Sequence, residues 1–150
     1  MAYRERLWPA PWLYLATALV IPASLLVLLP ISLAAGVVTA LVLYAGCLAL
    51  LLTGSPVVEV GPDGLRAGRA LLEPRFVGDA VALRDDEATH ARGPGLDARA
   101  YLLIRGWVTP VVRVEVRDER DPAPYWLISS RQPERLVEAI AAIRPRTPGR

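Results

Sequence analysis

The chain has 150 residues, of which 53% are hydrophobic and 21% are charged, and its formal net charge at pH 7 is +2. A balance this close to neutral, with no polybasic run, argues against the clustered basic face that binds nucleic acid. The only cysteine, Cys47, excludes an internal disulfide, so no oxidising compartment is implied.

The charged residues are distributed very unevenly. Residues 7–58 contain no Asp, Glu, Lys, Arg or His, so nearly all of the charge lies in the remainder of the chain. All 17 basic residues are arginine. This indicates a compositional bias and weakens any argument from the choice of arginine at a single position.

One straight helix cannot hold the uncharged segment within a membrane. About 50 helical residues would extend about 75 Å, whereas the hydrocarbon core of a bilayer is about 30 Å thick. Pro30 disfavours helix in the residue before it, and Ser32 is suited to cap the helix that follows. The sequence therefore predicts a transmembrane hairpin with spans at about residues 12–29 and 33–53. Pro22 falls inside the first span, where a kink is tolerated.

Two alternatives to the hairpin stay open. Arg4 and Arg6 followed by an apolar stretch resemble a signal peptide, with Ser32-Leu33-Ala34 as a small-x-small cleavage site. The first apolar segment could instead be re-entrant or interfacial, although it lacks the strongly polar face that an interfacial helix needs. The hairpin is favoured because a second span begins at once and the first is long for a signal peptide.

Arginines flank the predicted hairpin on one side of the membrane. Arg4 and Arg6 precede the first span, and Arg66, Arg69 and Arg75 follow the second, so the positive-inside rule predicts that both termini are cytoplasmic. Aromatic residues cluster at the start of the first span, as in an interfacial belt: Tyr3, Trp8, Trp12 and Tyr14.

Small residues in the second span predict close helix packing. Gly36 and Ala40 are four positions apart, a spacing that lets helix backbones approach, and they could seat the first span or a second copy of the protein. Neither span contains an ionisable residue. We therefore do not expect an ion path or coupled transport.

From residue 55 onward the pattern predicts short strands followed by one helix. Pro62-Asp63-Gly64 predicts a tight turn between two strands. Residues 111–117 alternate as in a half-buried strand, and residues 125–129 predict a shorter, more continuously apolar one. An amphipathic helix is predicted from Pro133 to about residue 144. Residues 85–100 are expected to form a loop-rich insert, in which Gly93-Pro94-Gly95 must be loop and a short helix could lie on either side.

This element order predicts a small α+β domain after the transmembrane hairpin. Several short antiparallel strands followed by one C-terminal helix suit a PH-like antiparallel sheet or barrel, and equally another α+β roll. The predicted domains are residues 1–54, an N-terminal cytoplasmic stub with the hairpin, and residues 55–150, a cytoplasmic PH-like domain.

No catalytic residue, cofactor or metal site is predicted. The carboxylates at residues 85–87 lack the spacing of an EF-hand calcium loop. The chain has a single histidine, His90, which excludes a multi-histidine zinc site within one chain. Ser129 and Ser130 lack a nucleophile elbow and are expected to serve as capping or turn residues. Six aromatic and basic residues are the candidate partner- or lipid-binding residues: Arg105, Trp107, Arg113, Tyr125, Trp126 and Arg131. Trp107 and Trp126 could instead belong to the core.

Three stretches carry a family resemblance: "YRERLW", "YLLIRGWVTPVVRVEV" and "DPAPYWLISSRQPERLVEAI". With the two spans they resemble the actinobacterial two-pass membrane proteins that are classed only as a domain of unknown function and whose soluble part looks PH-like. The resemblance implies a bacterial inner-membrane protein with a cytoplasmic domain, and it brings no catalytic residues.

We therefore expect a non-enzymatic inner-membrane protein whose cytoplasmic domain is a binding or scaffolding module. Its expected partners are the lipid bilayer and either a protein or a second copy bound through the hairpin, with no nucleic acid. The alternative is an accessory subunit or small enzyme of envelope lipid metabolism with a membrane-facing polar pocket. Arg105, Arg113 or Arg131 converging with a carboxylate in a concave site would favour that alternative.

Overall fold

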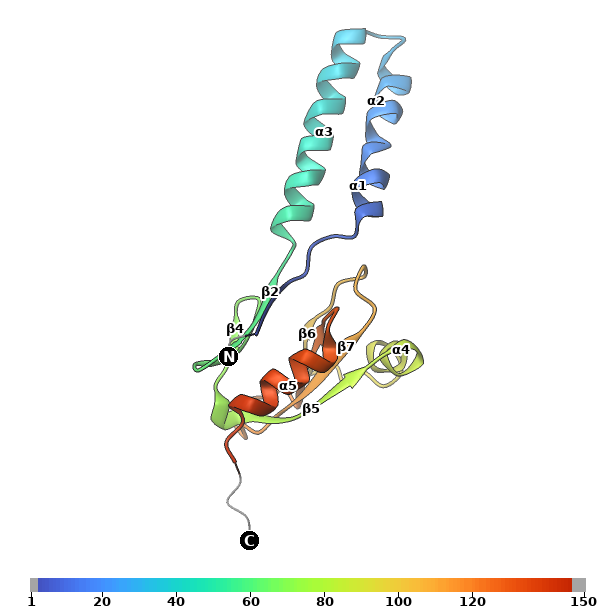
Figure 1. The fold of residues 1–150 in the computed structure, drawn as a ribbon. Coiled ribbons are helices and arrows are strands. Elements are labelled where there is room, and N and C mark those ends of the chain that lie inside the picture. Colours follow the sequence, from blue (N-terminus) through green and yellow to red (C-terminus); the bar gives the residue numbers. More distant parts are fainter. Residues whose placement is uncertain (1–2, 147–150) are drawn as a thin grey trace. The chain divides into compact units, whose positions relative to one another are not determined.

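The computed structural model describes residues 3–146 and divides them into two compact units (Figure 1). The helical unit comprises Trp8–Ser55, and the sheet unit comprises residues 3–7 together with residues 56–146. The sequence-based division at residue 54 differs from this at the N-terminus, because residues 3–6 form a strand of the sheet unit.

The helical unit contains α1 (Pro11–Ala18), α2 (Val20–Leu28) and α3 (Leu33–Thr53). Pro11–Leu28 and Leu33–Thr53 are both long and apolar enough to cross a membrane. The break between α1 and α2 follows from Pro22, because its ring clashes with the carbonyl group four residues earlier, at Ala18, where α1 ends. Ser32 caps α3 as predicted, with its hydroxyl accepting a hydrogen bond from the Ala35 backbone N–H.

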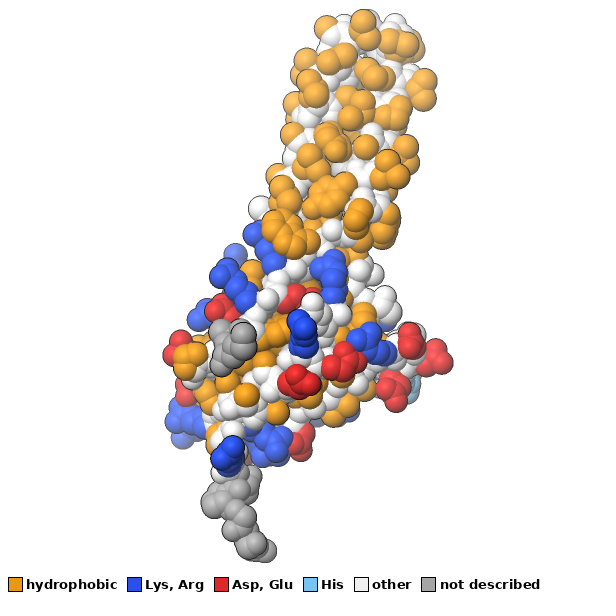
Figure 2. Space-filling view, in the orientation of Figure 1, with side chains coloured by type: hydrophobic (Ala, Val, Ile, Leu, Met, Phe, Trp, Pro, Cys, Tyr) orange, Lys and Arg blue, Asp and Glu red, His pale blue; other side chains and the backbone are white. Residues whose placement is uncertain are grey.

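Helices α2 and α3 pack on each other through small residues. Ser24, Gly36 and Ala40 are the buried residues of these helices. A Cβ atom at Gly36 would lie 3.3 Å from Cδ2 of Leu25. The spacing of Gly36 and Ala40 could seat either the first apolar segment or a second copy of the protein. In the structure, both residues are buried within the chain itself, and Gly36 lies against α2. Most other side chains of the helical unit are apolar and exposed (Figure 2).

The first sheet, sheet A, contains β1 (Tyr3–Arg6), β2 (Val57–Gly61), β3 (Gly64–Ala67) and β4 (Ala70–Leu72) in that order, all antiparallel. The helical unit is inserted in the chain between β1 and β2, whose residues pair from Tyr3 with Val60 to Arg6 with Val57. The predicted turn between β2 and β3 is confirmed. Gly64 there has a φ of +129° and approaches the Leu72 carbonyl so closely that a Cβ atom would lie 2.1 Å from its oxygen, so only glycine fits.

The second sheet, sheet B, has the strand order β5-β7-β8-β6. Strands β5 (Val77–Leu83), β7 (Val111–Val116) and β8 (Tyr125–Ser129) are antiparallel, and β6 (Tyr101–Leu103) pairs in parallel with β8. A short 3₁₀ helix, η1 (Pro74–Phe76), leads into β5. The strands predicted at residues 111–117 and 125–129 are confirmed, and they pair with each other in the antiparallel sense.

The C-terminal helix α5 (Pro133–Ile143) closes the core between the sheets. It begins at Pro133 as predicted, and Leu136 and Ile140 are fully buried on its apolar side. Inward side chains of both sheets complete this core, including Val58 and Val60 of β2 and Val112 and Val114 of β7. The sheet unit is therefore an α+β structure, as expected.

The prediction of a loop-rich insert at residues 85–100 was wrong in its first half. Asp85–Arg92 form helix α4. Three carboxylates occupy its first turn, and His90 and Arg92 lie in its last turn, an arrangement that complements the helix dipole. Ala88 is fully buried beneath the helix. The helix depends on this burial of Ala88 against the sheet unit, and a segment with so few apolar residues gives no sequence pattern that predicts it.

Candidate functional site

Strand β8 is buried on both faces of sheet B, and its second face forms the floor of the candidate site. Trp126 and Ile128 enter the main core, whereas Tyr125 and Leu127 join a smaller cluster with Val111 and Ala88. Alternate residues of a strand point to opposite faces. The continuous apolar run at residues 125–129 is thus explained by helices on both sides, with α4 covering part of the second face.

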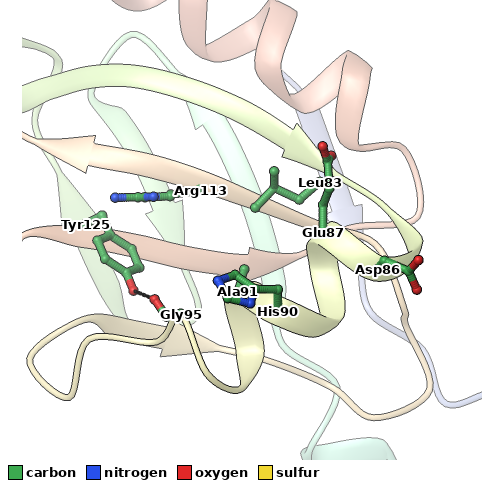
Figure 3. Close-up of a pocket in the computed structure, with 8 residues that line it drawn as sticks. All are labelled: Leu83, Asp86, Glu87, His90, Ala91, Gly95, Arg113 and Tyr125. Carbon is green, nitrogen blue, oxygen red and sulfur yellow. Dashed lines mark hydrogen bonds between the residues drawn. The ribbon is translucent and has the colours of Figure 1, made fainter.

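A pocket of about 460 Å³ lies beside α4 on this second face (Figure 3). Its side chains come from β5, α4, β7 and β8, with Gly95 from the segment that follows α4. The lining residues are Leu83, Asp86, Glu87, His90, Ala91, Gly95, Arg113 and Tyr125. Strands distant in sequence and one short helix therefore combine basic, acidic, imidazole and aromatic groups in one concave surface.

Arg113 and Tyr125 form one end of this pocket. The guanidinium carbon of Arg113 lies 4.3 Å from the centroid of the Tyr125 ring, a cation–π contact that contributes about 0.5–1 kcal/mol at an exposed position. Within residues 3–146 the Arg113 guanidinium group forms no hydrogen bond or ion pair, so its N–H donors are available to a ligand. The Arg113 guanidinium group can therefore bind a carboxylate or a phosphate through two parallel hydrogen bonds.

The Tyr125 hydroxyl holds the segment after α4 in place. It accepts a hydrogen bond of 2.8 Å from the Asp97 backbone N–H and donates one of 3.5 Å to the Gly95 carbonyl oxygen (Figure 3). The Asp97 carboxylate in turn accepts hydrogen bonds from the Arg99 side chain and backbone, which lower its pKa to about 2. The segment that brings Gly95 to the pocket is therefore tied to the pocket floor by the Tyr125 hydroxyl.

Helix α4 contributes Asp86, Glu87 and His90 to the lining of the pocket. In Figure 3 the two carboxylates lie away from Arg113, with the imidazole ring between them and Arg113. The His90 ring lies directly against Gly95, where an added Cβ atom would be 2.7 Å from Cδ2 and Nε2. Gly95 is therefore required for this placement of His90.

Of the six candidate binding residues, the structure brings only Arg113 and Tyr125 together in this pocket. Trp126 belongs to the core, 4% exposed, with its ring centroid 4.6 Å from that of Tyr101. Trp107 is half-buried and its indole N–H donates to the Leu7 carbonyl oxygen. Arg105 is half-buried, and its backbone N–H donates to the Ser129 hydroxyl.

The sixth candidate, Arg131, belongs to a hydrogen-bond network that sequence reasoning missed. Its backbone N–H donates to the Glu5 carboxylate at 2.8 Å, and the hydroxyl groups of Ser130 and Tyr3 donate to the same carboxylate. Burial, followed by the Glu5 hydrogen bond, raises the pKa of the Tyr3 phenol. The period-two alternation of Tyr3 and Glu5 with Arg4 and Arg6 was the available signal for a strand here.

A comparison of the sequence with known protein families finds a match. Residues 2–140 match the family described as protein of unknown function (DUF3093). The chain belongs to the DUF3093 family. No curated protein and no solved structure matches it.

Within residues 3–146 of the DUF3093 chain, no group of three or more His, Cys, Asp or Glu side chains is arranged to hold a metal ion. Ser129 and Ser130 do not approach His90 through any hydrogen bond in the described part of the chain. The Ser129 hydroxyl instead accepts from Arg105, and the Ser130 hydroxyl accepts from the Gln132 backbone N–H just before α5. Ser130 therefore acts in the turn before α5, as expected, whereas Ser129 ends β8 and bonds to the segment after β6, and the N-cap of α5 is Gln132.

Proposed function

We propose that this DUF3093 protein is a two-pass bacterial inner-membrane protein with both termini in the cytoplasm. Its sheet unit is a PH-like module that binds a partner through the pocket at Arg113 and Tyr125. The proposal is carried by the pairing of β1 with β2 on either side of the apolar segment.

Paired strands must lie on the same side of a bilayer, because their backbone hydrogen bonds cannot form across it. The segment between β1 and β2 must then cross an even number of times or not at all. Two apolar helices of sufficient length, Pro11–Leu28 and Leu33–Thr53, supply two crossings. Their exposed apolar side chains, such as Leu26 at 75% and Ile31 at 77%, suit a lipid environment.

The N-terminal strand also supports an uncleaved chain. Leu7 is fully buried in the core of the sheet unit, and Glu5 accepts hydrogen bonds from three groups of that unit. Cleavage after Ala34 would remove both residues and expose the edge of β2. The signal-peptide alternative is therefore disfavoured.

The cytoplasmic, PH-like and actinobacterial parts of the proposal have separate support. Arg4 and Arg6 before the hairpin and Arg66 and Arg69 after it follow the positive-inside rule. A four-stranded antiparallel sheet, the three adjacent antiparallel strands β5, β7 and β8, and a C-terminal helix follow the element order of a PH-like barrel. Strand β6, parallel to β8, is an addition to that order. The actinobacterial source is proposed from the sequence resemblance.

A disulfide between β1 and β2 tests, in the full-length protein, whether the two ends of the apolar segment lie on the same side of the membrane, as two crossings require. In a Cys47→Ala background, Arg4→Cys and Glu59→Cys place two thiols at directly paired positions, within the range that a disulfide spans. Mild oxidation of native membranes should join them within one chain. The control pair, Arg4→Cys with Arg66→Cys, lies two strands apart, about 10 Å, and should not join. Equal crosslinking of both pairs, or of neither, would contradict the proposal.

Capture in native membranes tests the binding module. Photo-crosslinking from a probe near the pocket, followed by identification of joined proteins and co-purified lipids, should yield a specific partner. Arg113→Gln should reduce its recovery, because the stacked guanidinium group is removed. Arg120→Gln, an exposed change in the loop between β7 and β8, should leave recovery unchanged. Recovery of bulk lipid alone would contradict the module.

The second candidate is an accessory subunit or small enzyme of envelope lipid metabolism. It is favoured by one observation: Arg113 shares a pocket with Asp86, Glu87 and His90. An enzyme needs the imidazole or carboxylates for proton transfer, whereas a binding module needs Arg113 above all. His90→Gln should therefore alter the lipid composition of the cells if this candidate is correct, and leave it unchanged if the module is correct.

A further inference from the structure

We infer that the exposed face of sheet A docks on the surface of a bilayer that contains anionic phospholipids. This inference rests on the proposed function only in requiring that the hairpin be inserted in a membrane. The docking surface, called here the arginine surface, consists of Arg4, Arg6, Arg66 and Arg69.

A single row of side chains crosses the outer face of sheet A. The strand register pairs Arg4 with Glu59, Glu59 with Arg66, and Arg66 with Leu71. Arg4, Arg66 and Leu71 are exposed, Leu71 at 43%. The alternate residues of the same strands, among them Val58 and Leu65, are fully buried in the core. The outer face is thus polar and basic by strand alternation.

The remaining two arginines lie at the end of sheet A from which the chain enters the apolar helices. Arg6 pairs with Val57, and the Val57 carbonyl accepts a hydrogen bond from the Gly68 backbone N–H, next to Arg69 in the turn between β3 and β4. Asp63 lies in the turn at the opposite end of the sheet. The positive charge of sheet A is therefore concentrated at its membrane-connected end.

Three members of the arginine surface form no ion pair with a carboxylate in the described part of the chain: Arg4, Arg66 and Arg69. Glu59 is the one acidic residue in the row itself. The third carboxylate of the β1–β3 region, Glu5, points to the opposite face and bonds to Ser130. By contrast, the first turn of α4 carries three carboxylates. The charge complement of the arginine surface is an anionic surface.

Chain continuity selects the bilayer as that anionic surface. Arg6 is five residues before Pro11, the first residue of α1, so fully extended chain separates them by at most about 18 Å. Basic side chains this near a membrane gain about 1 kcal/mol each from anionic lipids, which corresponds to about fivefold in a docking equilibrium. The exposed Leu71 adds an apolar contact at the same face.

Thiol accessibility in nanodiscs tests the inference with the full-length chain. In the Cys47→Ala background, Leu71→Cys reports on the arginine surface and Asp63→Cys reports on the opposite end of the sheet. Each variant is inserted into nanodiscs of phosphatidylcholine alone or with 30% phosphatidylglycerol, and the rate of reaction with a charged, membrane-impermeant maleimide is measured. We expect reaction at residue 71 to slow at least threefold in the anionic discs and reaction at residue 63 to stay within 1.5-fold.

Charge variants complete the test. Arg66→Gln with Arg69→Gln should weaken docking about 25-fold and restore rapid labelling at residue 71, as should 1 M salt, which shortens the screening length to about 3 Å. The matched control, Arg120→Gln with Arg146→Gln, removes two exposed arginines elsewhere and should leave the protection intact.

Each outcome decides the inference. Equal rates in the two lipid compositions would overturn it while leaving the crosslink between β1 and β2 untouched. Protection that appears only after native membrane proteins are added would also overturn it and assign the arginine surface to an acidic protein. Failure of the chain to insert would overturn both this inference and the proposed function.

Discussion

The Ser130 hydroxyl donates a hydrogen bond of 2.6 Å to the carboxylate of Glu5, which lies 125 residues earlier in the chain. Glu5 comes from the strand before the apolar helices and Ser130 from the connection between β8 and α5. This contact, with those of Tyr3 and the Arg131 backbone, joins residues that precede and follow the apolar helices in sequence into one folded unit.

Replacement of Glu5 should destabilise the sheet unit. Glu5→Ala removes the acceptor for three donors. Only the Ser130 hydroxyl among them is fully buried, and a buried donor left without its partner costs about 1–3 kcal/mol, whereas the more exposed donors can bond to water. We expect a loss of about 2–3 kcal/mol, measured as the free energy of unfolding of the sheet unit in the detergent-solubilised protein. Glu138→Ala, an exposed change on α5, should cost less than 0.5 kcal/mol, about the limit for a surface substitution. Equal losses in the two variants would show that the Glu5 network does not stabilise the fold.

Enlargement of Gly36 should separate α2 from α3. An added Cβ atom already lies 3.3 Å from Leu25, so Gly36→Leu forces the helices apart at a cost of about 1–3 kcal/mol. Thermal unfolding of the protein in nanodiscs, followed by far-UV circular dichroism, should show a lower midpoint. The matched control is Gly46→Leu on the same helix, where an added Cβ atom meets nothing within 4 Å. A lower midpoint for Gly46→Leu than for Gly36→Leu would contradict this packing.

The ion pair between Arg84 and Glu134 should make stability depend on pH in the acid range. Two hydrogen bonds of 2.7 Å join the guanidinium group to the carboxylate, and they lower the Glu134 pKa from its ordinary 4.5 to about 2. Because the folded-state pKa is depressed, the stabilisation is present above about pH 4.5 and is lost as the pH falls toward 2. The difference in unfolding free energy between the natural chain and Glu134→Gln should shrink across this window and should be smaller in 1 M salt, since the pair is exposed. A difference that is constant from pH 6 to pH 2 would assign the effect to something other than this ion pair.

Loss of the Tyr125 hydroxyl should loosen the segment that walls the pocket. Tyr125→Phe keeps the ring under Arg113 but removes the acceptor for the Asp97 backbone N–H, a net cost of about 1 kcal/mol. Hydrogen exchange at the Asp97 amide should become about fivefold faster, while amides of β8 keep their protection. The comparison variant, Tyr101→Phe, removes a hydrogen bond to Ala67 in sheet A and should leave the Asp97 amide unchanged.

The local elements of the fold could be predicted from the sequence where one periodicity dominates. The span at Leu33–Thr53, the alternation of Val112 and Val114 with Arg113, and the start of α5 at Pro133 are each set by hydrogen bonding and side-chain direction within a few residues. The opposite holds for α4. Its composition is polar, and burial of Ala88 against the second face of sheet B holds it in place. No short-range pattern reports that contact.

The uncharged segment, its division at Pro30, and the alternation or capping behind several strands and helices can be predicted from the sequence, because they depend on residues close together in the chain. The pairing of β1 with β2, the contact of Glu5 with Ser130, and the stacking of Arg113 on Tyr125 beside His90 are evident only in the folded chain. These are pairings between residues far apart in sequence. Each gains its free energy only when loops have closed and the partners are already in register, so no local preference specifies them.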